Sequence, residues 1–178
     1  MKRVQKDDRG FSLVEIIIVV AIMSVMLGTV GYGLSLSDGK PAEECARKLV
    51  SVIQHGRTTT MGKYRNEIYV KNVGGKFIVE EQILVREGEP AGVRSSTVGG
   101  KGVVVEYSTD EGANYTELTD GAFIMLAFDA GSGALKKTGP GDTYYSRFRI
   151  SRAGTVEWIK IETLTGKVIL SDQNPDAP

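Results

Sequence analysis

One stretch near the N-terminus constrains this chain more than any other. Directly after Gly10, an apolar run extends from Phe11 to Val30 and is interrupted only by Ser12, Glu15, Ser24, Gly28 and Thr29. As a helix, a run of this length spans about 30 Å, which is the thickness of the hydrocarbon layer of a bilayer. The sequence therefore predicts a membrane-spanning helix over 11–30, followed by a much longer and more polar remainder.

Glu15 is the exception within this run. An acidic side chain in a membrane segment costs roughly 2.5–3.5 kcal/mol at the centre of the bilayer and less near its edge. A carboxylate in such a place indicates a function, and it requires a partner.

Three kinds of N-terminal segment compete to explain the run. The basic residues that precede it predict a cytoplasmic N-terminus and an exported remainder; they are Lys2, Arg3, Lys6 and Arg9. A secretory signal peptide fits poorly, because residues 31–36 contain no A-x-A cleavage site. A simple membrane anchor explains the length and the charges but leaves Glu15 without a purpose. A processed assembly signal explains all three features.

The order of residues around Gly10 resembles that of the type IV prepilins and pseudopilins. In that family a short basic leader ends in glycine, an aromatic N-methylated residue follows, and a glutamate stands four residues later ahead of an apolar helix. Gly10, Phe11 and Glu15 match this pattern without departure. The resemblance implies cleavage by a prepilin peptidase between Gly10 and Phe11, and methylation of the new Phe11 amine.

The resemblance also implies where the chain resides and what it contacts. It implies a single-pass protein of the cytoplasmic (inner) membrane with an extracytoplasmic head, and later a filament at the cell surface or in the periplasm. The implied partners are other pilin or pseudopilin subunits, the inner-membrane assembly platform and, before assembly, the lipid bilayer. The implied function is that of a structural subunit, which polymerises into a pilus or a secretion pseudopilus.

A physical role for Glu15 follows from the implied cleavage. Cleavage leaves a cationic amine on Phe11, which lies among apolar helices in a filament. Glu15 of one subunit can pair with the Phe11 amine of its neighbour, so that each buried charge has a partner. The alternative is a Glu15 side chain that only reaches toward the headgroup region.

The remaining sequence predicts an α+β fold, with a long N-terminal helical spine followed by an antiparallel β-sheet head, as in pilins. Gly31, Gly33 and Pro41 interrupt the helical pattern, and an apolar stripe then returns at three- and four-residue steps. Cys45 is the only cysteine, so no intramolecular disulfide can form. The expected segments are a removed leader 1–10, a transmembrane or assembly helix 11–30, a kink or hinge 31–41, a second spine segment 42–64, a β-rich head 65–171 and a disordered tail 172–178.

The head contains several short runs with strand character. We expect one antiparallel sheet with 123–128, the most apolar run, as a central strand, and a surface loop over the Gly- and Ser-rich 86–102. The other expected strands lie at 68–70, 77–79, 103–107, 145–150, 155–161 and 168–170. Ser108, Asp110, Gly112 and Tyr115 fit an Asp-box hairpin pattern. Asp129 begins a turn, for which a calcium loop is the alternative.

The end of the second helical segment provides a narrower resemblance. Arg57, followed by small polar residues and then by a predicted strand, is similar to the helix end of GspH/FimT-like minor pilins. Only Arg57 and its small or polar neighbours match.

Charge and composition limit the other possible functions. Lys+Arg and Asp+Glu are both 22, and loss of residues 1–10 leaves 18 basic and 20 acidic residues, so the bulk charge does not favour DNA. A competence pilin that binds DNA is the alternative function, with contacts from Arg147, Arg149, Arg152, Lys136 and Lys137; a solvated strand face would also explain these residues. With one histidine, one cysteine and no nucleophile motif, we expect no catalytic site, cofactor or metal.

Overall fold

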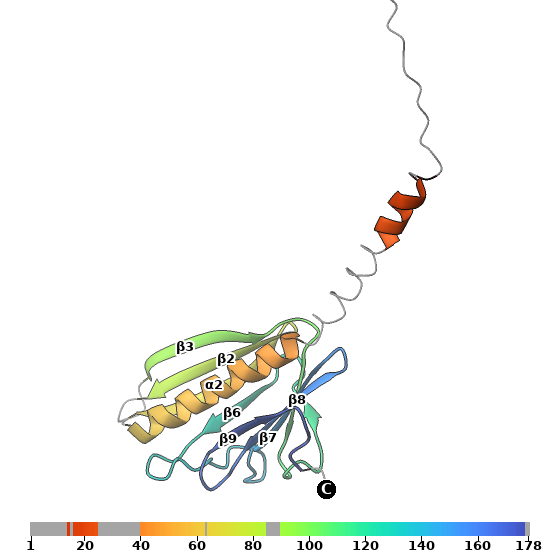
Figure 1. Ribbon diagram of the computed structural model, residues 1–178. Helices are drawn as coiled ribbons and strands as arrows, with labels where there is room; N and C mark the ends of the chain where they lie inside the picture. Colours follow the sequence, from red (N-terminus) through yellow and green to blue (C-terminus); the bar gives the residue numbers. More distant parts are fainter. Residues whose placement is uncertain (1–13, 15, 25–39, 63, 85–89, 177–178) are drawn as a thin grey trace, which may run out of the picture. The chain divides into compact units, whose positions relative to one another are not determined.

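A computed structural model describes residues 14, 16–24, 40–62, 64–84 and 90–176 of the chain (Figure 1). The chain divides into two compact units, Met1–Asp38 and Gly39–Pro178. In the first unit, Val14 and residues 16–24 are helical. Gly10, Phe11 and Glu15 lie outside the described residues, and so does nearly all of the predicted break at 31–41.

The second unit begins with helix α2, Lys40–Gly62. Pro41 lies in the first turn, where a backbone N–H would have no partner within the helix, so its absence costs nothing. The acidic Glu43 in the same turn interacts favourably with the helix dipole. One face of α2 is buried, and its members are Ala42, Cys45, Ala46, Leu49, Ile53, Gly56 and Thr60. The helix thus starts two residues before the predicted segment 42–64 and ends two residues before its end.

Within the described residues, nine strands form two sheets in which all pairs are antiparallel. The strands are β1 Arg65–Val73, β2 Lys76–Leu84, β3 Pro90–Gly99, β4 Val104–Ser108, β5 Thr116–Glu117, β6 Phe123–Ala127, β7 Arg147–Arg152, β8 Thr155–Ile161 and β9 Val168–Ser171. Their order is β3-β2-β1-β6 in a four-stranded sheet and β5-β4-β7-β8-β9 in a five-stranded sheet.

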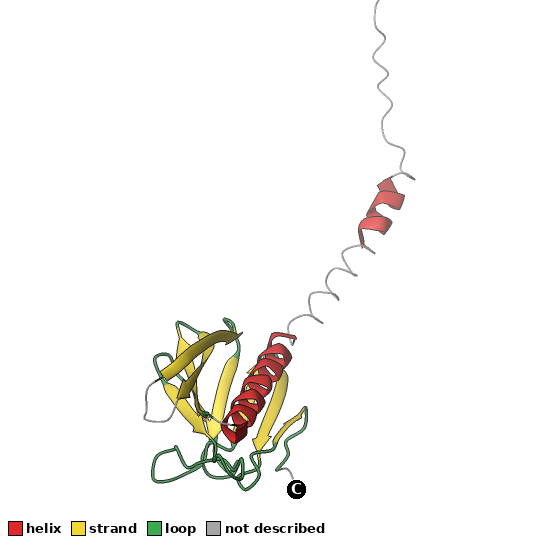
Figure 2. Cartoon of the chain, turned by 90° about the vertical axis from the view of Figure 1, so that its left-hand side faces the viewer, coloured by secondary structure: helices red, strands yellow, loops and turns green. Residues whose placement is uncertain are grey.

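Helix α2 contacts strands of both sheets, and Figure 2 shows it lying between strands that flank it on either side. Inward-facing strand residues alternate with outward-facing ones, and those facing inward meet Leu49 and Ile53 of the helix in one core. Ile68 in β1 and Phe148 in β7 are both fully buried members of this core. The predicted α+β class, a helix followed by a head rich in antiparallel sheet, is confirmed. We predicted one sheet, but the described residues form two. Both sheets pack against α2.

The predicted surface loop 86–102 is wrong for most of its length, because β3 occupies Pro90–Gly99. This strand pairs with β2 from Phe77↔Gly99 to Leu84↔Pro90, with a register shift near each end. Residues 92–97 are exposed without alternation, as expected for an edge strand whose two faces are both solvated. The period-2 pattern that reveals a half-buried strand is therefore missing from its sequence.

The apolar run 123–128 forms strand β6, but β6 is an edge strand and not the central strand that we predicted. Its outer edge is covered by the chain that follows it. Lys136 donates its backbone N–H to the Ala127 carbonyl at 2.8 Å, and the Thr138 hydroxyl donates to the Met125 carbonyl. Phe123 is nevertheless 60% exposed and Met125 is half-buried, so the continuous apolar sequence does not reflect burial on both faces.

Arg57 joins the end of α2 to two loops of the head. Its Nε donates to the Thr165 carbonyl at 3.0 Å and to the Gly133 carbonyl at 3.3 Å. The loops approach so closely that a Cβ on Gly166 would lie 2.0 Å from the Gly133 carbonyl oxygen. Gly166 also has a φ of 64°, which L side chains rarely adopt.

We expect Gly166→Ala to destabilise the head more than Gly154→Ala. Both glycines have positive φ, but a Cβ on Gly154 would meet no atom within 4 Å. The control substitution therefore carries only the left-handed backbone cost of about 1–2 kcal/mol. Displacement of the loop backbone should add roughly 1–3 kcal/mol for Gly166→Ala. The measurement is urea unfolding of the detergent-solubilised chain, and equal losses in the two variants would contradict the role of the close approach.

Candidate functional site

The helical residues of the N-terminal unit expose apolar side chains on every side. Residues 16–20 are Ile-Ile-Ile-Val-Val, and consecutive helical positions cover all directions around the axis. The exposed fractions of the large apolar side chains range from 46% at Val19 to 64% at Val14. Ser24, the polar residue among them, donates its hydroxyl to the Val20 carbonyl at 2.8 Å. A helix that is apolar all round requires an apolar surrounding.

The predicted membrane segment 11–30 extends beyond the described residues on both sides. Within the part of the chain that the structure describes, no helix combines the length and the apolar character required to cross a membrane.

On the head, Arg147 and Arg149 lie on one face of β7, as predicted, but each is already paired with a carboxylate. Arg149 Nε and Nη2 each lie 2.5 Å from a carboxylate oxygen of Glu106. Arg147 is only 8% exposed, and its Nε and Nη2 donate to the two carboxylate oxygens of Asp176 at 2.7 and 3.1 Å. Asp176 belongs to the predicted disordered tail 172–178, so this prediction is corrected for residues 172–176, which have a defined conformation.

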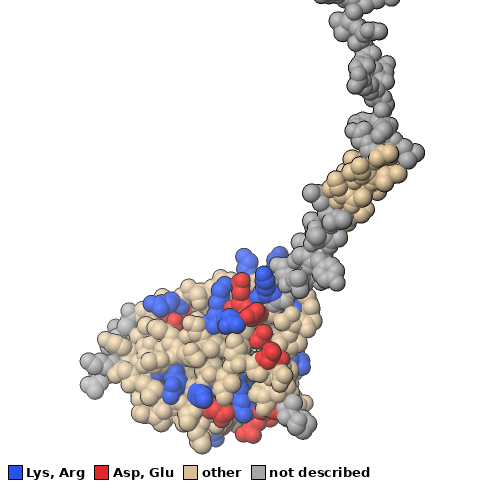
Figure 3. All heavy atoms as spheres, viewed as in Figure 1, with Lys and Arg blue, Asp and Glu red and all other residues tan. Residues whose placement is uncertain are grey.

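The other three predicted DNA contacts lie in different surroundings. Arg152 is half-buried at the end of β7, and the Lys137 ammonium lies 5.7 Å from the centroid of the Tyr144 ring. On the face of the head drawn in Figure 3, Lys and Arg side chains are intermixed with Asp and Glu. Because Arg147 and Arg149 are paired with acids as well, these observations do not favour a phosphate-binding surface.

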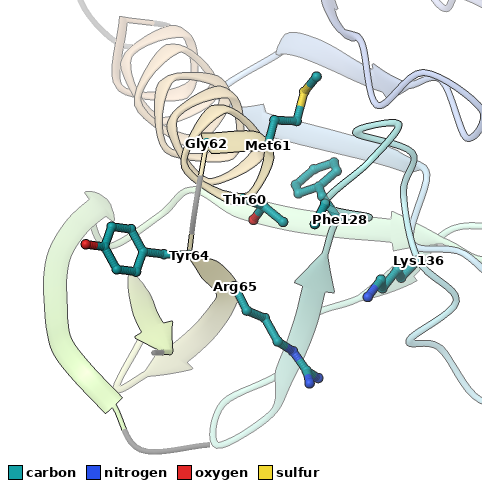
Figure 4. A pocket seen from close by; sticks show the side chains of 8 residues that line it. Thr60, Met61, Gly62, Tyr64, Arg65, Phe128 and Lys136 are labelled. Atoms are coloured by element: carbon teal, nitrogen blue, oxygen red, sulfur yellow. The ribbon is translucent and has the colours of Figure 1, made fainter. Parts of the chain in front are cut away.

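Lys136 belongs to a pocket of about 250 Å³ beyond the end of α2. Figure 4 shows Met61 of α2 and Phe128, which follows β6, lining the pocket near the helix end. Arg65 extends into it from β1, and Lys136 extends from the segment after β6. Arg65 donates to Glu67 across 2.8 Å. None of the described residues that line this pocket belongs to β7, so Lys136 does not share it with Arg147 and Arg149.

The Asp-box pattern forms a turn between β4 and β5. Asp110 accepts hydrogen bonds from the Ser108 hydroxyl at 2.6 Å, from the Asn114 backbone N–H at 2.9 Å and from the Asn114 side-chain amide at 2.6 Å. These bonds, first of all the one from Ser108, lower the pKa of the Asp110 carboxyl to about 2. Tyr115, at the end of the motif, packs edge-on against Trp158 with ring centroids 5.4 Å apart.

Asp129 closes its own turn. One carboxylate oxygen accepts hydrogen bonds from the backbone N–H groups of Gly131 and Ser132 at 3.1 and 2.9 Å, and from the Ser132 hydroxyl at 2.8 Å. The bonds from Ser132, followed by that from Gly131, lower the pKa of this carboxyl. These contacts within the turn explain the aspartate without a metal ion.

Sequence reasoning missed a buried polar cluster between α2 and the four-stranded sheet. Glu81 is 4% exposed, and its Oε1 lies 2.8 Å from His55 Nδ1 and 3.2 Å from the Asn66 side-chain amide, which donates to it. Glu81 shares the inward face of β2 with Val79. The alternation of inward- and outward-facing residues along β2 is the signal that could have identified Glu81 as buried.

A model of one protein family matches the chain. It is the prokaryotic N-terminal methylation motif, and the match covers residues 5–31, which include Gly10, Phe11 and Glu15. Comparisons with curated proteins and with solved structures gave no match. The chain therefore carries at its N-terminus the methylation motif of the type IV pilins and pseudopilins, and its α+β head is consistent with that family.

Proposed function

We propose that this protein is a minor, GspH/FimT-like structural subunit that polymerises into a type IV pilus or a secretion pseudopilus. The observation that carries the proposal is the methylation motif at residues 5–31, which continues into a helix with apolar side chains on all sides. Such a helix is suited first to a bilayer and then to a bundle of like helices. The narrower assignment rests on Arg57, which lies near the end of α2 and ahead of β1, as in the resemblance given above.

The proposed assembly begins in the inner membrane, with the head on its extracytoplasmic side. Prepilin peptidase removes residues 1–10, the amine of Phe11 is methylated, and the assembly platform moves the subunit into the filament. In the filament, Glu15 faces the Phe11 amine of a neighbour, and the pairing sets the axial register between helices.

The head contributes a unit with its own core. Among the described residues, the members of its buried cluster lie between Ala42 and Val168. The proposed role is therefore divided between a helix that polymerises and a head that is displayed on the filament.

Mechanical shearing of native cells tests the proposal. We expect the processed chain in the sheared filament fraction, and the unprocessed chain only in membranes. A matched strain that lacks the prepilin peptidase should retain the whole population in the membrane. Absence of the chain from filaments in cells that assemble them would contradict the proposed function.

A further inference from the structure

On the outer face of the five-stranded sheet, neighbouring strands β7 and β8 place two cationic side chains together. Arg147 is almost fully buried there, and its Nη1 also donates to the Ser146 carbonyl at 3.2 Å, which fixes the guanidinium. Lys160, its partner across β7 and β8, lies 3.8 Å from Asp176 and 3.3 Å from Glu162. The two cations thus converge on a single carboxylate, that of Asp176.

The Asp-box turn provides space and a further polar group at this site. Gly112 has a φ of 98°, and a Cβ there would lie 2.8 Å from Asp176 Oδ2 and 3.3 Å from the Tyr115 hydroxyl. That hydroxyl is buried and has no hydrogen-bond partner in the described chain. A glycine therefore leaves room for the carboxylate, and an unpaired donor lies next to it.

The segment that supplies the carboxylate is held to this face through one residue. Gln173 donates its N–H to Oγ of Ser171, the last residue of β9, and Asp176 donates its N–H to Asn174 Oδ1, each at 3.0 Å. Among the described residues, all hydrogen bonds and ion pairs that join 173–176 to β7 and β8 are made by Asp176. The hydrogen bond from Arg147 lowers the pKa of the Asp176 carboxyl, so this carboxyl is ionised at neutral pH.

We propose that Arg147, Lys160, Gly112 and Tyr115 form a receptor for the carboxylate of an acidic peptide segment. Asp176 fills the receptor within its own subunit, and the C-terminal segment of a second copy can fill it in exchange. The ligand is the same carboxylate in both cases. Release of the segment from its own subunit requires only the loss of the contacts made by the Asp176 side chain. Exchange of an identical element between copies has little intrinsic cost, and it would connect neighbouring heads. This inference does not depend on the proposed function.

Trp158 makes the site measurable. It is the only tryptophan of the chain, and it touches Tyr115, with Arg149 5.6 Å from its ring centroid. We would truncate the chain after Ser171 and titrate the detergent-solubilised variant with a peptide of residues 171–178, with Trp158 fluorescence as the readout. We expect saturable binding, and about tenfold weaker binding of the same peptide carrying Asp176→Asn.

Two full-length variants control for truncation. Asp176→Asn should open the receptor and bind the natural peptide, even if the truncated chain does not fold. Asp172→Asn should respond like the unsubstituted chain, whose receptor is occupied, because Asp172 lies in a different groove with Glu43 and Glu157. Failure of the folded open variants to bind, or equal affinity for both peptides, would overturn the proposal. Displacement of the peptide by inorganic phosphate or duplex DNA at equal concentration would also overturn it, since the face would then be a general anion surface.

Discussion

The chain purified from its native membrane or filament is expected to begin at Phe11 and to carry one methyl group on that residue's amine. A Gly10→Val variant should keep residues 1–10, because a branched side chain next to the scissile bond obstructs the peptidase, whereas glycine has no Cβ. Intact mass and N-terminal peptide sequencing distinguish the two chains directly. The effect should be close to all or none.

Retention of the leader should also prevent assembly. Without cleavage the Phe11 nitrogen is an amide and carries no charge, so it cannot pair with Glu15 of a neighbour. The uncleaved chain also keeps Lys2, Arg3, Lys6 and Arg9, which would have to enter an apolar filament core. Gly10→Ala is the matched control, since it keeps a small residue and should be processed at least in part. A mature chain that begins at any residue other than Phe11 would contradict the predicted cleavage.

The parts of the fold that local sequence predicted are those with a regular pattern. The stripe of α2 repeats at helical spacing from Ala42 to Thr60, so a helix there is visible in the sequence. Strand β3 has no such pattern, because residues 92–97 are exposed on both faces of the strand. The edge position of β6 could not be inferred either, since a returning segment covers an edge as fully as a neighbouring strand does.

The same distinction applies to the candidate sites. Gly10, Phe11 and Glu15 stand within six residues, so their register is visible in the sequence. The bond between Arg147 and Asp176 joins residues 29 apart, and that between His55 and Glu81 joins residues 26 apart. Which acid pairs with which base is decided by the tertiary fold. The basic residues of β7 therefore suggested a DNA contact that their carboxylate partners now disfavour.

We expect Glu15→Ala to abolish incorporation into filaments while processing at Gly10 continues. Removing one partner of a buried ion pair costs roughly 3–5 kcal/mol, because the other charge remains buried alone. This corresponds to a loss of about two to four orders of magnitude in the equilibrium for adding a subunit. The measurement is the ratio of processed chain in sheared filaments to processed chain in membranes.

The control is taken from the second compact unit of the chain, Gly39–Pro178, which does not contain Glu15. Glu44→Ala removes a carboxylate from α2 whose side chain is 68% exposed, and it should leave incorporation unchanged, since exposed ion pairs contribute little. Both variants should unfold at the same denaturant concentration as the unsubstituted chain, because the core between Ala42 and Val168 contains neither residue. A Glu15→Ala chain that is processed, folded and incorporated normally would refute the pairing with Phe11. Glu15 would then be a carboxylate that reaches the headgroup region, and apolar packing alone would have to determine how neighbouring helices align.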